Sequence, residues 1–158
     1  MNIAEQMANL EHKDHSRAYD SLNVLLAESE CGRAVYAYLD TFVRMLASPH
    51  SYVRNRGLSL IAANARWDET GRIAGILDTY LLALQDKKPV TARTCLKGLS
   101  KIVQARPELS RQIGQALAQA DFRLYQSSMR TLLERDAEQI LAQIAAARRN
   151  SDKAGRQR

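Results

Sequence analysis

The sequence has few glycines and prolines, which break helices, few cysteines, which form crosslinks, and a single tryptophan. Its 158 residues include seven glycines, three prolines, two cysteines and one tryptophan. Because glycine and proline interrupt helices, their scarcity favours long helices. Cys31 and Cys95 lie far apart, without CxxC spacing or a nearby histidine. We therefore predict two reduced thiols that behave as small hydrophobic residues, and neither a disulfide framework nor a metal site.

Long apolar runs are absent as well. No stretch approaches the roughly 20 apolar residues that a membrane-spanning helix needs. Residues 1–10 carry Glu5 and no basic residue ahead of their apolar positions, so they lack the pattern of a secretory signal. We expect a cytoplasmic protein without a membrane span.

The composition is that of a globular domain whose positive charge is concentrated near the C-terminus. The hydrophobic fraction is 46% and the charged fraction is 25%, and the length fits one domain. Residues 1–86 hold 8 basic and 11 acidic residues, whereas residues 87–158 hold 15 and 6. Residues 148–158 contribute five of those bases against one acid and lack apolar periodicity. We predict a folded domain at residues 1–147 and a disordered basic tail at residues 148–158.

Apolar residues recur at steps of three and four through most of the chain, for example at Ile73, Ile76, Leu77, Tyr80, Leu81 and Leu84. No segment alternates convincingly with the period of two that a strand requires. Pro49, Pro89 and Pro107 separate helical segments. These signals predict an all-α fold with helices near residues 2–10, 14–30, 33–47, 50–65, 69–85, 89–105, 107–119, 122–134 and 135–149.

The chain repeats itself with a period close to 38 residues. Residues 40–42 (Asp-Thr-Phe) return at residues 78–80 (Asp-Thr-Tyr), and Arg17, Arg54 and Arg93 each follow a short polar turn. The pattern resembles HEAT repeats, which pair a polar residue in a turn with an arginine about six residues later. The resemblance implies an α-α superhelix, a HEAT- or armadillo-like α-solenoid of about four helix pairs.

The three repeated arginines place a fork of donors at the starts of helices. Such a guanidinium reaches the carboxylate of its own turn or of the neighbouring turn, which ties stacked repeats together. We interpret Arg17, Arg54 and Arg93 as a structural ladder, with ligand contact as the alternative. The fourth unit, from Asp121 to Ser127, has no arginine at this place.

Residues 51–68, Ser-Tyr-Val-Arg-Asn-Arg-Gly-Leu-Ser-Leu-Ile-Ala-Ala-Asn-Ala-Arg-Trp-Asp, resemble a small bacterial HEAT-repeat family commonly labelled "SufBD protein". Residues 1–14 and the turn at 88–93 are similar too, so the resemblance covers the chain to about residue 145. The scaffolds that the label refers to are β-helical partners in iron–sulfur cluster assembly, whereas this sequence has neither a β-helical pattern nor clustered thiolates. The resemblance implies a HEAT-like fold and a non-enzymatic role without a cofactor.

No catalytic motif is present: the sequence has no Gly-rich phosphate loop, GxSxG elbow or HExxH helix. His12 and His15, beside Glu11 and Asp14, would need a further ligand to hold a metal, and we interpret this segment as a polar turn. His50, alone in the equivalent turn, is expected to be solvated. We predict no enzymatic activity and no bound metal.

Trp67 and Asp68 bear a faint resemblance to the aromatic and acidic residues of HEAT-like alkylpurine DNA glycosylases. The further aromatic residues that this family uses against DNA are missing, because Trp67 is the only tryptophan. We therefore expect Trp67 to pack between repeats and Asp68 to cap a helix.

The best candidate binding surface is the polar side of the predicted helix at 89–105. At about 100° per residue, its basic and amide side chains form a stripe away from the apolar side, and two arginines of the preceding helix continue it. In HEAT repeats the second helix of each pair lines the concave face. The predicted partner-binding residues are Arg56, Arg66, Arg93, Lys97, Lys101 and Gln104.

A basic groove fits an acidic protein segment or a phosphate backbone. Nucleic acid would favour stacking aromatics, and only Tyr52 and Tyr125 are candidates to face the groove. We predict a HEAT-repeat adaptor or scaffold that binds a protein partner. Nucleic-acid binding through the groove and the tail is the alternative, and a polar helix face that is merely solvated is also left open.

Overall fold

The computed structural model describes residues 2–157; Met1 and Arg158, at the outer ends of the predicted domain and tail, lie outside the described residues. The described chain contains eight α-helices and no strand, which confirms the predicted all-α fold. None of these helices is long and apolar enough to cross a membrane. The α-helices are α1 (Ile3–Asn9), α2 (His15–Cys31), α3 (Leu39–Met45), α4 (Ser51–Ala63), α5 (Arg72–Leu81), α6 (Pro89–Ala105), α7 (Ser110–Gln119) and α8 (Ser127–Arg156).

Short 3-10 helices continue or introduce several of the α-helices, so that some expected single helices are made of two pieces. They are η1 (Val35–Tyr38) before α3, η2 (Ala65–Trp67) after α4, η3 (Leu82–Gln85) after α5, η4 (Pro107–Leu109) before α7 and η5 (Phe122–Leu124) before α8. Prolines 89 and 107 stand at the starts of α6 and η4, as their fixed φ angle favours.

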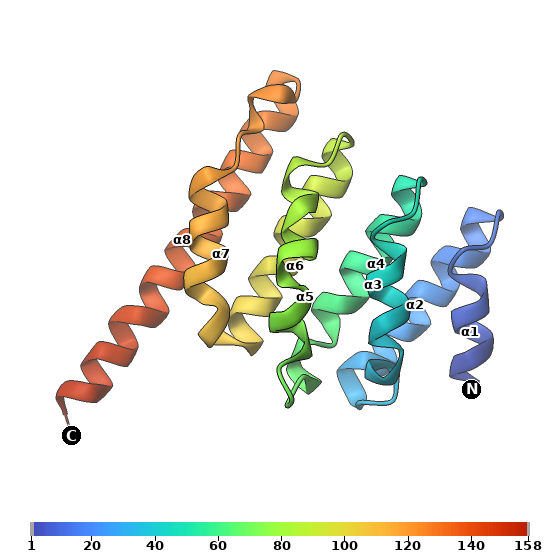
Figure 1. The fold of residues 1–158 in the computed structure, drawn as a ribbon, viewed down its shortest axis with the longest axis horizontal. Coiled ribbons are helices and arrows are strands. Elements are labelled where there is room, and N and C mark those ends of the chain that lie inside the picture. The colour runs from blue at the N-terminus through green and yellow to red at the C-terminus, as the bar shows by residue number, and fades with distance from the viewer. Residues whose placement is uncertain (1, 158) are drawn as a thin grey trace.

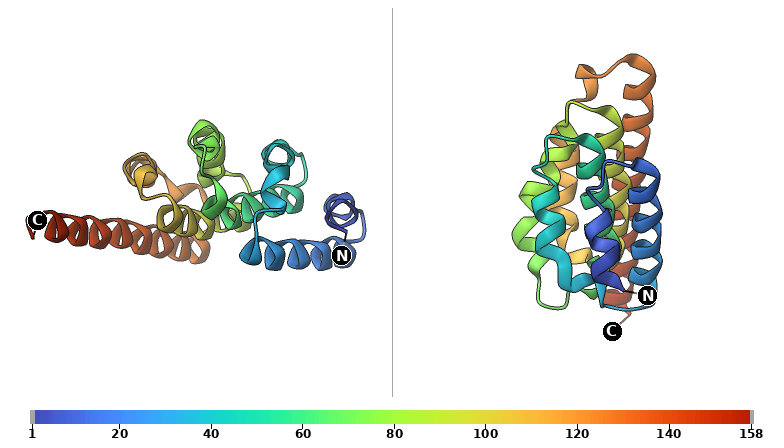
Figure 2. Two further views of the ribbon diagram at one scale, coloured as in Figure 1. Left: turned by 90° about the horizontal axis from the view of Figure 1, so that it is seen from below. Right: turned by 90° about the vertical axis from the view of Figure 1, so that its right-hand side faces the viewer.

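The helices lie in two layers. The first layer contains α1, α3, α5 and α7, the second contains α2, α4, α6 and α8, and in each layer the helices follow one another along the molecule (Figure 1, Figure 2). In the second layer, α2 packs on α4, α4 on α6, and α6 on α8; between layers, α1 packs on α2, α3 on α4, and α7 on α8. The N-terminal and C-terminal pairs therefore form opposite ends of the molecule.

The hydrophobic core lies between the two layers. The repeated segments at 40–42 and 78–80 bury Phe42 and Tyr80 completely. A glycine of the second layer faces each of them: a Cβ at Gly57 would come within 2.8 Å of the Phe42 carbonyl oxygen, and a Cβ at Gly98 would overlap the Tyr80 hydroxyl. The layers approach so closely here that any side chain would force its neighbours to move.

The predicted helix boundary at residues 134–135 is wrong. Residues 127–156 form one continuous helix, α8, and the expected separate start near residue 122 is the 3-10 turn η5. No glycine or proline occurs between residues 127 and 150. The buried residues Leu133, Ala137 and Ile140 keep helical spacing across the expected break.

The structure also differs from the prediction of a disordered basic tail. Residues 148–156 continue α8 and are exposed. Their arginines, lysine and alanine are good helix formers, and Lys153 and Arg156 in the last turn suit the negative end of the helix dipole. The domain boundary at residue 147 stays a prediction.

Candidate functional site

Two hollows lie on the surface of the second layer. The first, of about 420 Å³, lies where α2, α4 and α6 end together and is lined by Leu26, Glu30, Ala62, Ala63, Arg66, Lys101, Gln104 and Ala105. The second, of about 340 Å³, lies between α6 and α8 and is lined by Leu96, Lys97, Ser100, Lys101, Asp136, Gln139, Ile140 and Gln143. Lys101 lines both hollows. We call this combined surface the Lys101 groove.

Four of the six predicted partner-binding residues line this groove and are exposed: Arg66, Lys97, Lys101 and Gln104. Lys97 and Lys101 make no ion pair with any carboxylate in residues 2–157. Two lysines one helical turn apart thus present their charges to solvent.

Arg93, the fifth predicted residue, is committed to a neighbouring helix. Its Nε donates to Oδ2 of Asp136 in α8 over 3.1 Å, and both side chains are partly buried. Two further bonds join the same helices, because Ser100 and Gln143 exchange hydrogen bonds of 2.8 and 3.0 Å. Arg93 therefore fixes α6 against α8 at the edge of the groove, and Asp136 offsets its charge.

Arg56, the sixth predicted residue, does not belong to the groove. The residue is 6% exposed, and its Nη1 donates to the carbonyl oxygen of Leu10 over 2.7 Å. The guanidinium also lies 5.1 Å from the centre of the Tyr52 ring. Burial lowers the pKa of Arg56 below its usual value. Contrary to the prediction of partner binding, Arg56 holds α4 against the end of α1 and is inaccessible to a partner.

The three predicted ladder arginines have different environments. Arg54 donates to its own turn at the carbonyl oxygen of Ser48, and to both carboxylate oxygens of Asp86 in the next turn. Arg93 contacts a helix of its neighbour, as described above. Arg17 is exposed and makes no ion pair within residues 2–157. The structure therefore places one turn-to-turn contact, at Arg54, where the sequence predicted three.

A second set of arginine contacts lies at the opposite end of the second layer, and sequence reasoning missed it. Arg66 donates to the carbonyl oxygen of Glu30 over 3.1 Å, and Arg106 donates to the carbonyl oxygens of Ala65 and Arg66 over 2.9 and 3.2 Å. These carbonyls lie at helix ends, where partners within the helix run out. The 40-residue separation of Arg66 and Arg106 is close to the repeat period, and this signal could have revealed them.

Trp67 and Asp68 hold the chain together at the start of α5. The Asp68 carboxylate is buried and accepts 2.9 Å hydrogen bonds from two backbone N–H groups of α5, and a 2.6 Å bond from the Tyr36 hydroxyl. The Trp67 indole N–H donates to the carbonyl oxygen of Ser29 over 2.7 Å. The packing of Trp67 matches the prediction, and the Asp68 side chain bonds to the first turn of α5, although the N-cap position itself is Gly71 and not Asp68 as predicted.

The histidines take part in turns and ring packing. Nδ1 of His12 accepts a 3.0 Å bond from the backbone N–H of Asp14, and the rings of His15 and His50 lie 4.4 and 5.2 Å from that of Tyr52. No group of three or more potential metal ligands gathers in the described part of the chain.

Neither tyrosine predicted to face the groove is available there. Tyr52 lies among His15, His50 and the Arg56 guanidinium. Tyr125 is 7% exposed, and its hydroxyl donates to the carbonyl oxygen of Asp86. The groove therefore has cations and amides but lacks the aromatic platform that we expected for stacking nucleic-acid bases.

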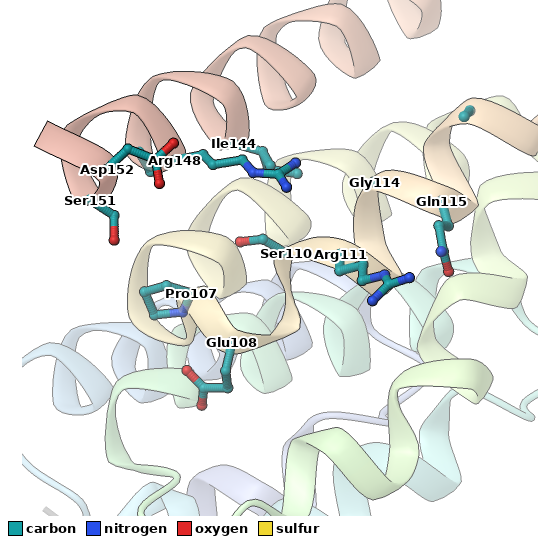
Figure 3. Close-up of a pocket in the computed structure, with 12 residues that line it drawn as sticks. Pro107, Glu108, Ser110, Arg111, Gly114, Gln115, Ile144, Arg148, Ser151 and Asp152 are labelled. Atoms are coloured by element: carbon teal, nitrogen blue, oxygen red, sulfur yellow. The ribbon is translucent and has the colours of Figure 1, made fainter. Parts of the chain in front are cut away.

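A larger hollow lies at the C-terminal end, and none of the predicted site residues lines it. It has a volume of about 890 Å³ and lies between η4 and α7 on one side and the C-terminal half of α8 on the other (Figure 3). Ser110, Gly114, Ala118, Ile144, Ala147 and Ser151 are among the small and apolar residues that line it. Arg111 and Arg148 stand at its rim.

Comparisons with protein-family models, with curated proteins and with solved structures found no match. The resemblance to the family labelled "SufBD protein" therefore stays a prediction. The function of the chain is inferred from its own residues and their arrangement.

Proposed function

We propose that the chain is a HEAT-like α-α superhelix of four helix pairs that acts as a non-enzymatic adaptor and binds a protein partner along the Lys101 groove. The layered order of the helices and the repeat period near 38 residues support the superhelix. The binding role is carried by one observation: two hollows meet at Lys101, so the groove runs across helices of all four pairs.

The chemistry of the groove favours an acidic protein segment. Its floor contains small residues, such as Ala62 and Ala105, over which a chain can lie close to the helices. Unpaired cations at Lys97 and Lys101 attract carboxylates, while the exposed amides of Gln104 and Gln139 can bond to a main chain in either direction. In an interface of this kind, charge mainly raises the association rate and the specificity, whereas the buried surface supplies most of the affinity.

Charge reversal tests the placement of the site. The variant Lys97→Glu with Lys101→Glu should abolish capture of the protein partner from a cell extract, because each carboxylate then repels an acidic segment. The matched control is Lys87→Glu with Lys88→Glu, which makes the same change in net charge on the exposed turn before α6. Unchanged capture by the groove variant, or equal loss in the control, would contradict the proposed site.

Nucleic-acid binding is the alternative function, and one observation favours it. The exposed C-terminal half of α8 carries Arg148, Arg149, Lys153 and Arg156, which could approach phosphates together with the groove. The packed positions of Tyr52 and Tyr125 count against it. If the alternative holds, affinity for single-stranded or duplex DNA falls steeply with salt, because each neutralised phosphate releases counterions.

A further inference from the structure

One flank of α8 is exposed along the helix. α8 spans 30 residues, and its C-terminal half extends beyond α7 at one end of the molecule (Figure 1, Figure 2). The inner side buries Leu133, Ala137 and Ile140. A flank about a quarter turn around the helix from this buried side is exposed, and it includes Leu141, one of the few large apolar side chains that the fold leaves open.

Exposed residues of this flank follow a heptad-like spacing. Successive positions are separated by four, three, four, three and four residues, which places them in one line along a helix. They are Glu134, Glu138, Leu141, Ala145, Arg148 and Asp152. We call this line the α8 stripe. Its centre is apolar, its N-terminal part is acidic, and Arg148 stands in its C-terminal part.

The stripe adjoins the large hollow beside α7. Arg148 and Asp152 belong both to the stripe and to the rim of that hollow (Figure 3). Arg111 of α7 lines the same hollow. A Cβ added at Gly114 of α7 would lie 3.9 Å from the Ile144 side chain and 4.0 Å from the Leu141 side chain. A helix lying on the stripe would therefore also reach the edge of α7.

At one pair of positions the charges of the stripe complement a second copy of the same stripe in antiparallel orientation. If Leu141 lies opposite Ala145 of the second copy, Glu138 lies opposite Arg148, and two-fold symmetry makes each contact twice. Arg149 follows Arg148 in the sequence and Arg111 lines the same hollow as Arg148, so positive charge gathers at this part of the stripe. In parallel orientation the same residues would face themselves, so that like charges meet.

The ends of the stripe have mixed charge. In the antiparallel register Glu134 lies opposite Asp152, which is a like-charge contact, although the Glu134 carboxylate lies 4.0 Å from the Arg130 guanidinium of its own chain. Glu138, Arg148 and Arg149 make no ion pair within residues 2–157, so they are free to form new ones. Complementarity is therefore concentrated on Glu138 and Arg148.

We propose that two copies of this chain associate through their α8 stripes, antiparallel, with Glu138 of each copy paired to Arg148 of the other. The stripe is about 27 Å long at 1.5 Å per residue. A contact of that length is small beside a standard interface of about 1,600 Å². The association is consequently weak, reversible and weakened by salt. It is independent of the Lys101 groove, which lies on the far side of the α6–α8 contact.

A charge swap tests this pairing. Sedimentation velocity of nuclease-treated protein over a wide concentration range should reveal a monomer–dimer equilibrium for the wild type. Glu138→Arg alone and Arg148→Glu alone should each raise the dissociation constant by at least about tenfold, because two symmetric pairs become repulsive. The double variant, with both changes, should restore association to near the wild-type level.

The control variant Lys97→Glu with Lys101→Glu leaves the stripe intact and should dimerise normally. Circular dichroism of each variant verifies that these exposed changes leave the helices intact. If the wild type is monomeric at every concentration, the stripe does not bind a second copy of the chain and the proposal is overturned. The proposal is also overturned if Glu138→Arg leaves the dissociation constant unchanged, or if the double variant does not regain association.

Discussion

Arg54 of α4 forms a bidentate ion pair with Asp86, 32 residues later in the chain, with Nε–Oδ2 and Nη2–Oδ1 distances of 2.9 and 2.8 Å. Its remaining Nη1 donates to the carbonyl oxygen of Ser48 over 3.0 Å. One side chain thus joins the turn before α4 to the turn before α6. The two charged side chains are only 10% and 11% exposed, so each depends on the other in a setting with little water.

Arg54→Ala should therefore lower the free energy of unfolding by about 3–5 kcal/mol, since it leaves the Asp86 carboxylate buried without its counter-charge. Arg17→Ala is the matched control, because Arg17 occupies the equivalent repeat position but is exposed, and its change should stay within about 0.5 kcal/mol. Urea denaturation of both variants measures the two values. Similar values for the two arginines would contradict the turn-to-turn role of Arg54.

Gly98→Ala should destabilise the fold by about 1–3 kcal/mol, because the new methyl group would overlap the buried Tyr80 hydroxyl. Gly75→Ala, inside α5 with open space around it, should instead stabilise by up to about 1 kcal/mol. Adding Tyr80→Phe to Gly98→Ala should cost less than the sum of the two single changes, since removal of the hydroxyl makes room. Additive losses in thermal unfolding would show that the two residues do not meet.

The two cysteines should differ in reactivity. Cys31 is exposed, whereas Cys95 is buried and burial raises its pKa well above the usual range. A thiol reagent should label one site rapidly in the native protein and the second only as the chain unfolds. Cys31→Ser should remove the fast phase. Rapid labelling of that variant under native conditions would be inconsistent with the packing of α6 against α5.

The fold class could be predicted because helical periodicity and sparse breakers leave one interpretation. Leu133, Ala137 and Ile140 carry the same periodicity through α8, yet the expected pairing of short helices led to a boundary that no glycine or proline supports. The tail was judged by its charge and polarity. Its helix propensity, and its attachment to a helix already nucleated by packing, favoured continuation.

The exposure of the candidate site residues could be predicted only where it depends on the periodicity of a single helix. Lys97, Lys101 and Gln104 are exposed as the periodicity of α6 indicates. Arg56 also lies on a polar face of its helix, but α1 approaches that face and offers the carbonyl of Leu10. Such an approach depends on the packing of distant segments, which the spacing of residues within one helix does not encode.

The most direct test of the adaptor function is affinity co-purification of tagged protein from the cells that express it. The experiment compares wild type with the Lys97→Glu, Lys101→Glu variant, each with and without nuclease. The account predicts a stoichiometric protein that survives nuclease treatment and is lost from the variant. Material that disappears on nuclease treatment, or a partner retained equally by both chains, would contradict protein binding in the Lys101 groove.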